Sequence, residues 1–169
     1  MKLAGAVLIL LAGICAGHCL VAERRARIAA LGDLIRSLEW MHGEMQLLAT
    51  PLPELLTQAA GKSGRVSKAL FEAITAKLDH LGEESFSSIW QSELPRCCGM
   101  LRQEEQEELA SLGMLLGRFS LDEQLLAIEH CVRNLSGKRE ALERSAPSFR
   151  RLALGLCVSS GALLVIILY

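Results

Sequence analysis

Residues 103–135 read QEEQEELASLGMLLGRFSLDEQLLAIEHCVRNL, and this stretch decides the fold class. Leucines recur at three- and four-residue steps on both sides of Gly117, which is the spacing of one face of an α-helix. Ser120 and Glu123 have the spacing of a capping box at the start of the second half. The stretch therefore predicts a helix over 103–116, ended by Gly117, and a long helix that runs from 121 toward Pro147.

The same spacing continues upstream. It predicts a helix from about Arg25 to Leu48, stopped by Thr50-Pro51, because a residue before proline is disfavoured in helical geometry. Three shorter helices are expected over 52–59, 66–81 and 85–94, ended respectively by the glycines at 61–64, by Gly82 and by Pro95, which marks an end or a kink. No useful strand alternation occurs in the sequence. We predict an all-α fold, an antiparallel bundle of about six helices, forming one domain over 23–151.

Two uncharged apolar runs, 3–22 and 152–169, flank this domain, and every Asp and Glu lies between Glu23 and Glu143. Twenty helical residues rise about 30 Å, the thickness of a bilayer core. The runs are therefore interpreted as transmembrane helices at both ends of the chain. A buried core helix is the alternative for the second run.

Arginines at the inner border of each run predict the topology. They are Arg24, Arg25 and Arg27 after the first run, and Arg150 and Arg151 before the second. Because Lys and Arg near a span stay on the cytoplasmic side, the domain is expected to face the cytoplasm. The alternative is an exported, envelope-facing binding protein with a cleaved N-terminal signal and a C-terminal anchor.

The sequence contains no convincing catalytic or metal-binding pattern. Gly61-Lys62-Ser63 resembles the end of a phosphate-binding loop, but the glycine required five positions earlier is Leu56. Cys97-Cys98 and His130-Cys131 could together suggest a zinc site. Adjacent helical residues, however, diverge by about 100° and ligate one zinc ion poorly, so the cysteines are interpreted as buried thiols. A thiol enzyme using Cys131 would lack a base. With a net charge of −1 and 4% aromatic residues, nucleic acid is not an expected partner. We expect no enzyme activity, cofactor or metal.

Several short motifs together resemble the stage III sporulation protein AB family of endospore-forming bacteria over nearly the whole chain. The matching positions are Met41-x-x-Glu44-Met45, Thr50-Pro51-Leu52-x-x-Leu55, Trp90-x-x-x-Leu94, Leu109-x-x-Leu112-Gly113-x-x-Leu116-Gly117, Gln124, Leu135 and Phe149-Arg150-Arg151-Leu152-x-x-Gly155. Ser120, His42 and Leu47 depart from the residue types expected there. The family is itself similar to the inner-membrane platform protein of type II secretion and type IV pilus systems.

This resemblance implies a non-enzymatic membrane platform of a secretion-like complex that connects mother cell and forespore during endospore formation. It implies a location in the outer forespore membrane, with the helical domain in the mother-cell cytoplasm. The expected partners are a motor ATPase, other membrane subunits of the channel complex and, as an open question, further copies of the chain.

Two surfaces are candidates for partner contact: the loop at Thr50, Pro51 and Leu52, and the acidic first turn of the helix that begins at 103. The acidic residues are Glu104, Glu105, Glu107 and Glu108. Within the second apolar run, Gly155 and Ser159 have small-x3-small spacing and are candidates for close packing in the membrane.

Overall fold

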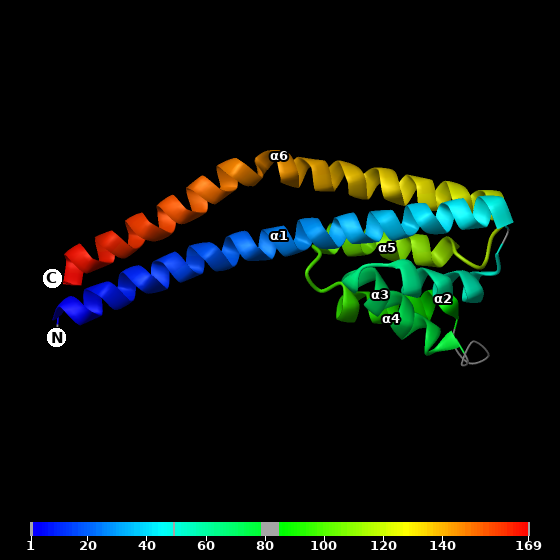
Figure 1. Ribbon diagram of the computed structural model, residues 1–169, viewed down its shortest axis with the longest axis horizontal. Coiled ribbons are helices and arrows are strands. Elements are labelled where there is room, and N and C mark those ends of the chain that lie inside the picture. Colours follow the sequence, from blue (N-terminus) through cyan, green and yellow to red (C-terminus); the bar gives the residue numbers. More distant parts are fainter. Residues whose placement is uncertain (1, 49, 79–84, 169) are drawn as a thin grey trace. The chain divides into compact units, whose positions relative to one another are not determined.

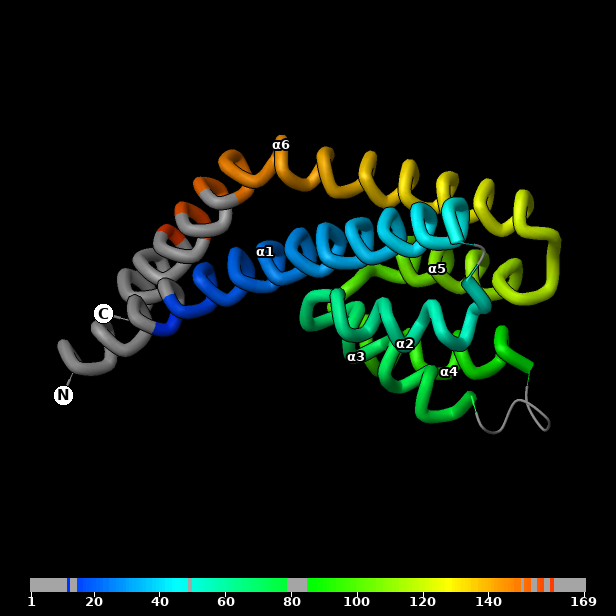
Figure 2. Tube along the Cα trace, turned by 45° about the vertical axis from the view of Figure 1, so that its right-hand side comes forward, coloured from blue at the N-terminus to red at the C-terminus, as the bar shows by residue number. Residues whose placement is uncertain are grey.

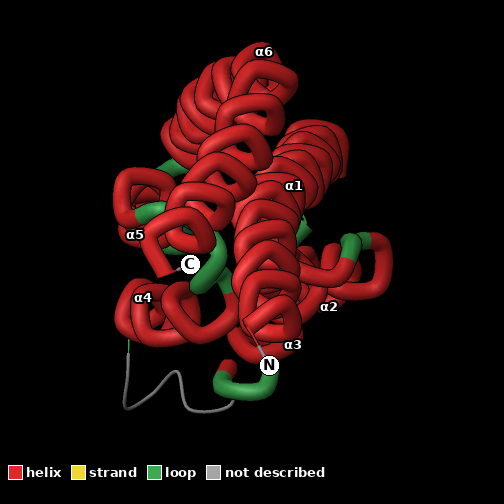
Figure 3. The backbone as a smooth tube through the Cα atoms, turned by 90° about the vertical axis from the view of Figure 1, so that its left-hand side faces the viewer, coloured by secondary structure: helices red, strands yellow, loops and turns green. Residues whose placement is uncertain are grey.

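The computed structural model of the chain describes residues 2–48, 50–78 and 85–168. These residues form six α-helices joined by loops, with no strand among them (Figures 1 and 3). The helices are α1 (Lys2–Leu48), α2 (Leu52–Lys62), α3 (Arg65–Thr75), α4 (Phe86–Cys97), α5 (Gln103–Leu115) and α6 (Leu121–Leu168). The predicted all-α class is confirmed for this part of the chain.

The chain divides into two compact units, and α1 and α6 contribute to both. We call residues 29–140 the bundle unit, and residues 1–28 with 141–169 the terminal unit. In the bundle unit, α2 packs on α3, α3 on α4 and α4 on α5. These short helices gather beside the second half of α1 in two different views (Figures 1 and 2).

The core of the bundle unit is centred on the apolar stripe of α1. Leu31, Leu34, Leu38 and Met41 are at most 1% exposed. Leucine, isoleucine, phenylalanine and tryptophan side chains of α2–α6 complete the core: Leu55, Leu56, Leu70, Phe71, Ile74, Ile89, Trp90, Leu94, Leu109, Leu112, Ile128 and Leu135. Burial of such side chains is the main favourable term in folding. The apolar spacing that predicts this helix continues to Leu48, but Leu48 is 69% exposed and lies outside the core.

A buried carboxylate of α1 caps the start of α3. Asp33 is 6% exposed, and its side-chain oxygens accept hydrogen bonds from the backbone N–H groups of Gly64 (2.8 Å), Val66 (3.0 Å) and Ser67 (3.1 Å). The first N–H groups of a helix have no partner within it, and a negative charge there is stabilised by the helix dipole. Asp33 therefore fixes α3 to α1. A Cβ atom at position 64 would overlap this carboxylate, so Gly64 is required for the close approach.

The motif that begins at Trp90 and the leucine-glycine motif that begins at Leu109 meet in the core. Trp90 of α4 is fully buried, and its Nε1 donates a hydrogen bond to the carbonyl oxygen of Leu109 in α5 at 2.8 Å. The indole ring lies against Gly113, where a Cβ would overlap ring atoms. The Phe86 ring also packs against the tryptophan, with ring centroids 5.7 Å apart. These motif residues therefore join α4 to α5.

Helix boundaries agree with the sequence prediction in most places and differ at the ends of three helices, of which α2 continues to Lys62 instead of ending at residue 59. The helix expected to reach Gly82 ends at Thr75, and Gly82 lies outside the described residues. Pro95 lies inside α4, which continues to Cys97 instead of ending at Leu94. A proline is tolerated there because only the last turn follows it.

The terminal unit contains the beginning of α1 and the end of α6. Both apolar runs continue a helix of the bundle unit and are not separate helices, so the described residues have six helices in total where about eight were expected. Over the part of the chain that the structure describes, no helix is both long enough and apolar enough to cross a membrane.

Candidate interaction surfaces

The turn between α5 and α6 is held by the most specific motif of the sequence. Gly117 has a φ of 77°, in the left-handed region that favours glycine. Its backbone N–H donates to Gln124 Oε1 at 3.2 Å, and Gln124 Nε2 donates to the Phe119 carbonyl at 2.8 Å. Glu123 Oε2 accepts from the Ser120 backbone N–H at 3.0 Å and from its hydroxyl at 2.7 Å. The predicted capping is confirmed.

The loop from Thr50 to Leu52 lies against this turn. Leu52 is half-buried, and its Cδ2 atom lies 3.1 Å from the place a Cβ would take at Gly117. Thr50 is half-buried, whereas Pro51 is exposed. Pro51 is therefore the exposed residue of the loop, while Leu52 packs between the two turns.

Next to the two turns, large apolar side chains are exposed to solvent. Leu47 is 82% exposed, Leu126 is 64% exposed and Phe119 is 47% exposed. A groove of about 480 Å³ lies between the end of α5 and the start of α6, and we call it the α5–α6 groove. Its lining residues are Leu115, Phe119, Glu123, Leu126, Ala127, Glu129, His130 and Arg133. Clustered exposed apolar side chains with a polar rim are typical of a protein-binding site.

The acidic first turn of α5 is less exposed than predicted. Glu105 is completely buried, and its carboxylate accepts a hydrogen bond from the Arg102 backbone N–H at 2.9 Å. Glu108 is half-buried and accepts from Asn134 Nδ2 of α6 at 2.6 Å. Glu104 and Glu107 are exposed. The predicted surface is therefore wrong for Glu105, which serves as a helix cap, and it is reduced to two exposed carboxylates.

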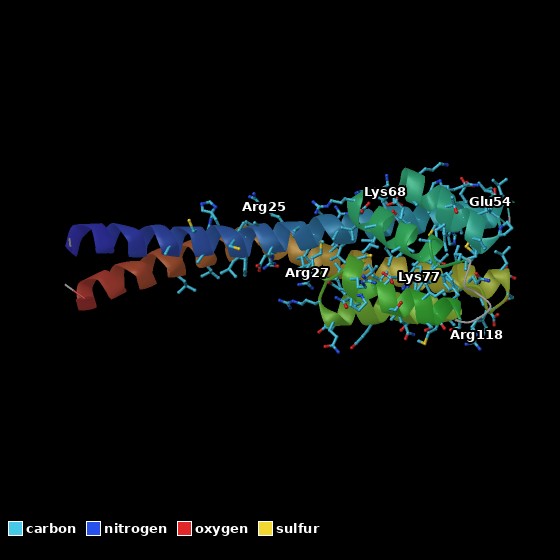
Figure 4. All side chains as sticks on the ribbon, turned by 90° about the horizontal axis from the view of Figure 1, so that it is seen from below. Arg25, Arg27, Glu54, Lys68, Lys77 and Arg118 are labelled. Atoms are coloured by element: carbon cyan, nitrogen blue, oxygen red, sulfur yellow. The ribbon has the colours of Figure 1, made fainter. Side chains whose placement is uncertain are left out.

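The predicted border arginines differ in their surroundings. Arg24 Nη2 donates to the Leu142 carbonyl at 3.1 Å and to the Ser145 hydroxyl, and so joins α1 to α6 within the terminal unit. Arg25 and Arg27 project from different sides of α1 (Figure 4), as expected for residues two apart on a helix. Arg151 is exposed, and the side chain of Arg150 lies outside the described part of the structure.

Gly155 and Ser159 lie one turn apart on α6. The Ser159 hydroxyl donates to the Gly155 carbonyl oxygen at 2.7 Å. This bond satisfies the hydroxyl within its own helix, which suits an apolar environment. Both residues are exposed, and their packing against another helix stays a prediction.

Two thiols of the bundle unit are buried. Burial raises the pKa of Cys98 to about 12 and that of Cys131 to about 12. A thiolate is the reactive form of cysteine, and burial disfavours this form at both positions. Among the described residues, no three His, Cys, Asp or Glu side chains lie close enough together to hold a metal ion.

Sequence reasoning missed the α5–α6 groove because it placed Leu115 together with Leu116 in the apolar stripe of the helix expected over 103–116 and did not consider Leu126. Leu115 and Leu116 are adjacent, as are Leu125 and Leu126, and neighbouring residues point about 100° apart on a helix. One member of each pair must turn away from the buried stripe. Leu115 and Leu126 are those members, with exposures of 36% and 64%. The pairs of adjacent leucines at the end of α5 and at the start of α6 were therefore the sequence signal from which the groove could have been predicted.

The fold defines the class of the protein over the described residues: an all-α helical bundle with two long helices, α1 and α6. The family model of stage III sporulation protein AB matches residues 2–169, so the chain belongs to that family. It is also similar to a solved structure of stage III sporulation protein AB, with a TM-score of 0.64 and 23% sequence identity over 72% of this chain and 97% of that chain. Comparison with curated proteins finds no match. The sequence resemblance is confirmed, and the family supports a role in sporulation.

Proposed function

We propose that the chain is a membrane-anchored, non-enzymatic platform subunit of a secretion-like complex that connects mother cell and forespore. Membership of the stage III sporulation protein AB family supports the sporulation role. The observation that carries the platform role is the open apolar α5–α6 groove, because Leu126 and Phe119 are exposed together inside a rim of charged side chains, as at a protein-binding site.

The anchoring part of the proposal rests on the two apolar runs and their charged borders. The runs at 3–22 and 152–169 contain no Asp, Glu, Lys or Arg. Arg24 and Arg25 follow Glu23 at the end of the first run, and Arg150 and Arg151 immediately precede the second run. This distribution favours insertion at both ends with residues 23–151 on the cytoplasmic side. In a sporulating cell, that side would be the mother-cell cytoplasm, and the membrane would be the outer forespore membrane.

The groove is proposed as the binding site of the motor ATPase. It offers an apolar floor at Leu115, Phe119 and Leu126, while Arg133 and Glu129 on its rim form an ion pair of 2.6 Å. An amphipathic helix of the partner would place apolar side chains on the floor. Pro51 and the exposed carboxylates of Glu104 and Glu107 are proposed as additional contacts, and other membrane subunits or further copies of the chain as additional partners.

The experiment is a pull-down of the full-length chain from sporulating cells with Leu126→Gln in the groove. Met100→Gln is the matched control, because Met100 is an apolar residue that is 43% exposed in the α4–α5 turn. We expect Leu126→Gln to lower both ATPase recovery and spore yield, with unchanged helix content, and Met100→Gln to behave as wild type. Wild-type ATPase recovery by a folded Leu126→Gln chain would eliminate the groove as the binding site.

The placement in the cell is tested separately. A fluorescent fusion of the full chain should mark the membrane that surrounds the forespore, and alkaline carbonate should not extract it from membranes. A uniformly soluble fusion protein would contradict the anchoring.

A further inference from the structure

A second cavity, of about 270 Å³, lies in the terminal unit between α1 and α6. Its charged lining is entirely basic, from Arg24, Arg25 and Arg151, and its apolar walls include Val21, Ile28 and Phe149. No carboxylate belongs to its lining among the residues that the structure describes. The cavity is slightly smaller than the usual range of small-molecule sites, about 300–1,000 Å³, which suits one head group better than a drug-sized ligand.

One of the three arginines is held in place before any ligand binds. The guanidinium of Arg24 donates through Nη2 to the Leu142 carbonyl and the Ser145 hydroxyl, and its Cζ lies 4.4 Å from the centroid of the Phe149 ring. Its Nε is buried and has no hydrogen-bond acceptor within the described structure. Through its contacts with α6, the guanidinium of Arg24 is already fixed in the wall of the cavity and supplies an oriented positive charge there.

The other two arginines supply charge at the open side of the cavity. Arg25 and Arg151 are exposed, and neither forms an ion pair or hydrogen bond within the described part of the chain. Three guanidinium groups without a carboxylate in the lining favour a phosphate, whose oxygens match the planar fork of arginine.

The position of the cavity in the sequence indicates where this phosphate comes from. Arg24 and Arg25 lie just after the apolar run 3–22, and Arg151 lies immediately before the run 152–169. If both runs cross the bilayer, as the proposed function requires, these residues lie at the level of the phospholipid head groups. Basic pockets at the cytoplasmic ends of membrane helices are sites for anionic lipids. We propose that this cavity binds the phosphate group of an anionic phospholipid of the cytoplasmic leaflet.

The proposal is distinguishable from a topological role of the same arginines. Orientation requires only positive charge, which lysine also supplies, whereas a phosphate cradle requires the guanidinium fork and its contact with Phe149. Arg24→Lys and Arg151→Lys should therefore preserve membrane insertion and weaken lipid binding. Arg118→Lys is the control, since Arg118 is exposed in the α5–α6 turn of the bundle unit and does not belong to the lining of the cavity (Figure 4).

The experiment is native mass spectrometry of the full-length chain in detergent, titrated separately with phosphatidylglycerol, phosphatidylcholine and inorganic phosphate. The wild type and Arg118→Lys should retain one phosphatidylglycerol, and the two cavity variants should bind it roughly tenfold more weakly. Arg151→Lys alters an exposed side chain, so its result does not depend on refolding of the cavity.

Three results would overturn the assignment: cavity variants that bind phosphatidylglycerol as tightly as wild type, phosphatidylcholine binding as tight as phosphatidylglycerol binding, or equal binding of inorganic phosphate. Carbonate extraction of the same variants keeps the two proposals apart. Failure of the wild type to stay in membranes contradicts the anchoring, whereas unchanged lipid binding by membrane-bound variants contradicts the cavity.

Discussion

Replacing Asp33 with alanine should lower the free energy of unfolding of the bundle unit more than the loss of any other polar contact we describe. The substitution removes one carboxylate and leaves three backbone N–H groups at the start of α3 without their acceptor. A helix cap contributes about 0.5–2 kcal/mol and a hydrogen bond to a charged group about 1.5–3 kcal/mol. Because the three bonds share one carboxylate, we expect a loss of about 3 kcal/mol, out of a total stability of about 5–15 kcal/mol.

The assay is urea unfolding of the purified full-length chain in detergent, followed by tryptophan fluorescence, since Trp90 is completely buried in the native state. Glu39→Ala is the control, because Glu39 is an exposed carboxylate on the same helix. Gly64→Ala should also be destabilising in the wild type, where the new methyl group overlaps the Asp33 carboxylate, but nearly neutral in Asp33→Ala. Additive effects of the two substitutions, or a loss below about 0.5 kcal/mol for Asp33→Ala, would refute the capping arrangement.

Other predictions concern the α4–α5 contact, an acid-sensitive ion pair and the buried thiols. Gly113→Ala should cost about 1–3 kcal/mol in the same assay, because the new methyl group displaces Trp90; a neutral effect would contradict the close contact. Glu93 is 4% exposed, and a hydrogen bond from Lys77 lowers the pKa of its carboxyl from the ordinary value of 4.5. The Lys77–Glu93 pair therefore contributes stability above pH 4.5, and this stability is lost as the pH falls through the folded-state pKa of Glu93. Glu93→Gln should therefore lower stability by about 2 kcal/mol near neutral pH and make unfolding midpoints less sensitive to acid; an unchanged pH profile would contradict this role. Cys98 and Cys131 should react with a thiol reagent near neutral pH only after urea is added, and fast reaction in the native chain would contradict their burial.

Local sequence signals predicted most of the helices because each signal acts within a few residues. The capping pair Ser120–Glu123 and the left-handed Gly117 fix the α5–α6 turn through contacts between near neighbours. Gln124 belongs to the same turn, which explains in physical terms why it accompanies the glycine in the family motif.

Contacts between distant residues could not be predicted in this way. The sequence presents Asp33 as one more charged residue of an amphipathic helix, yet it caps a helix that starts 32 residues later, at Arg65. Glu105 was grouped with its acidic neighbours and is buried, because its own backbone-capping bond turns it inward. The α5–α6 groove was missed for a related reason: periodicity placed both Leu115 and Leu116 in the stripe and did not show that Leu115 is the exposed member of the pair.

The topology of the chain is the central claim, and the burial of its native thiols determines how to measure it. Protection of Cys98 and Cys131 from a reagent would report burial and not membrane sidedness. We therefore choose Ser111→Cys, an exposed position on α5, and Lys2→Cys before the first apolar run, each compared with the parent chain in intact vegetative cells.

With a membrane-impermeant maleimide, the cysteine at position 2 should be labelled in intact cells. The cysteine at position 111 should be labelled only after the membrane is permeabilised. Labelling of position 111 in intact cells would contradict a cytoplasmic platform and support the exported binding protein with a cleaved signal.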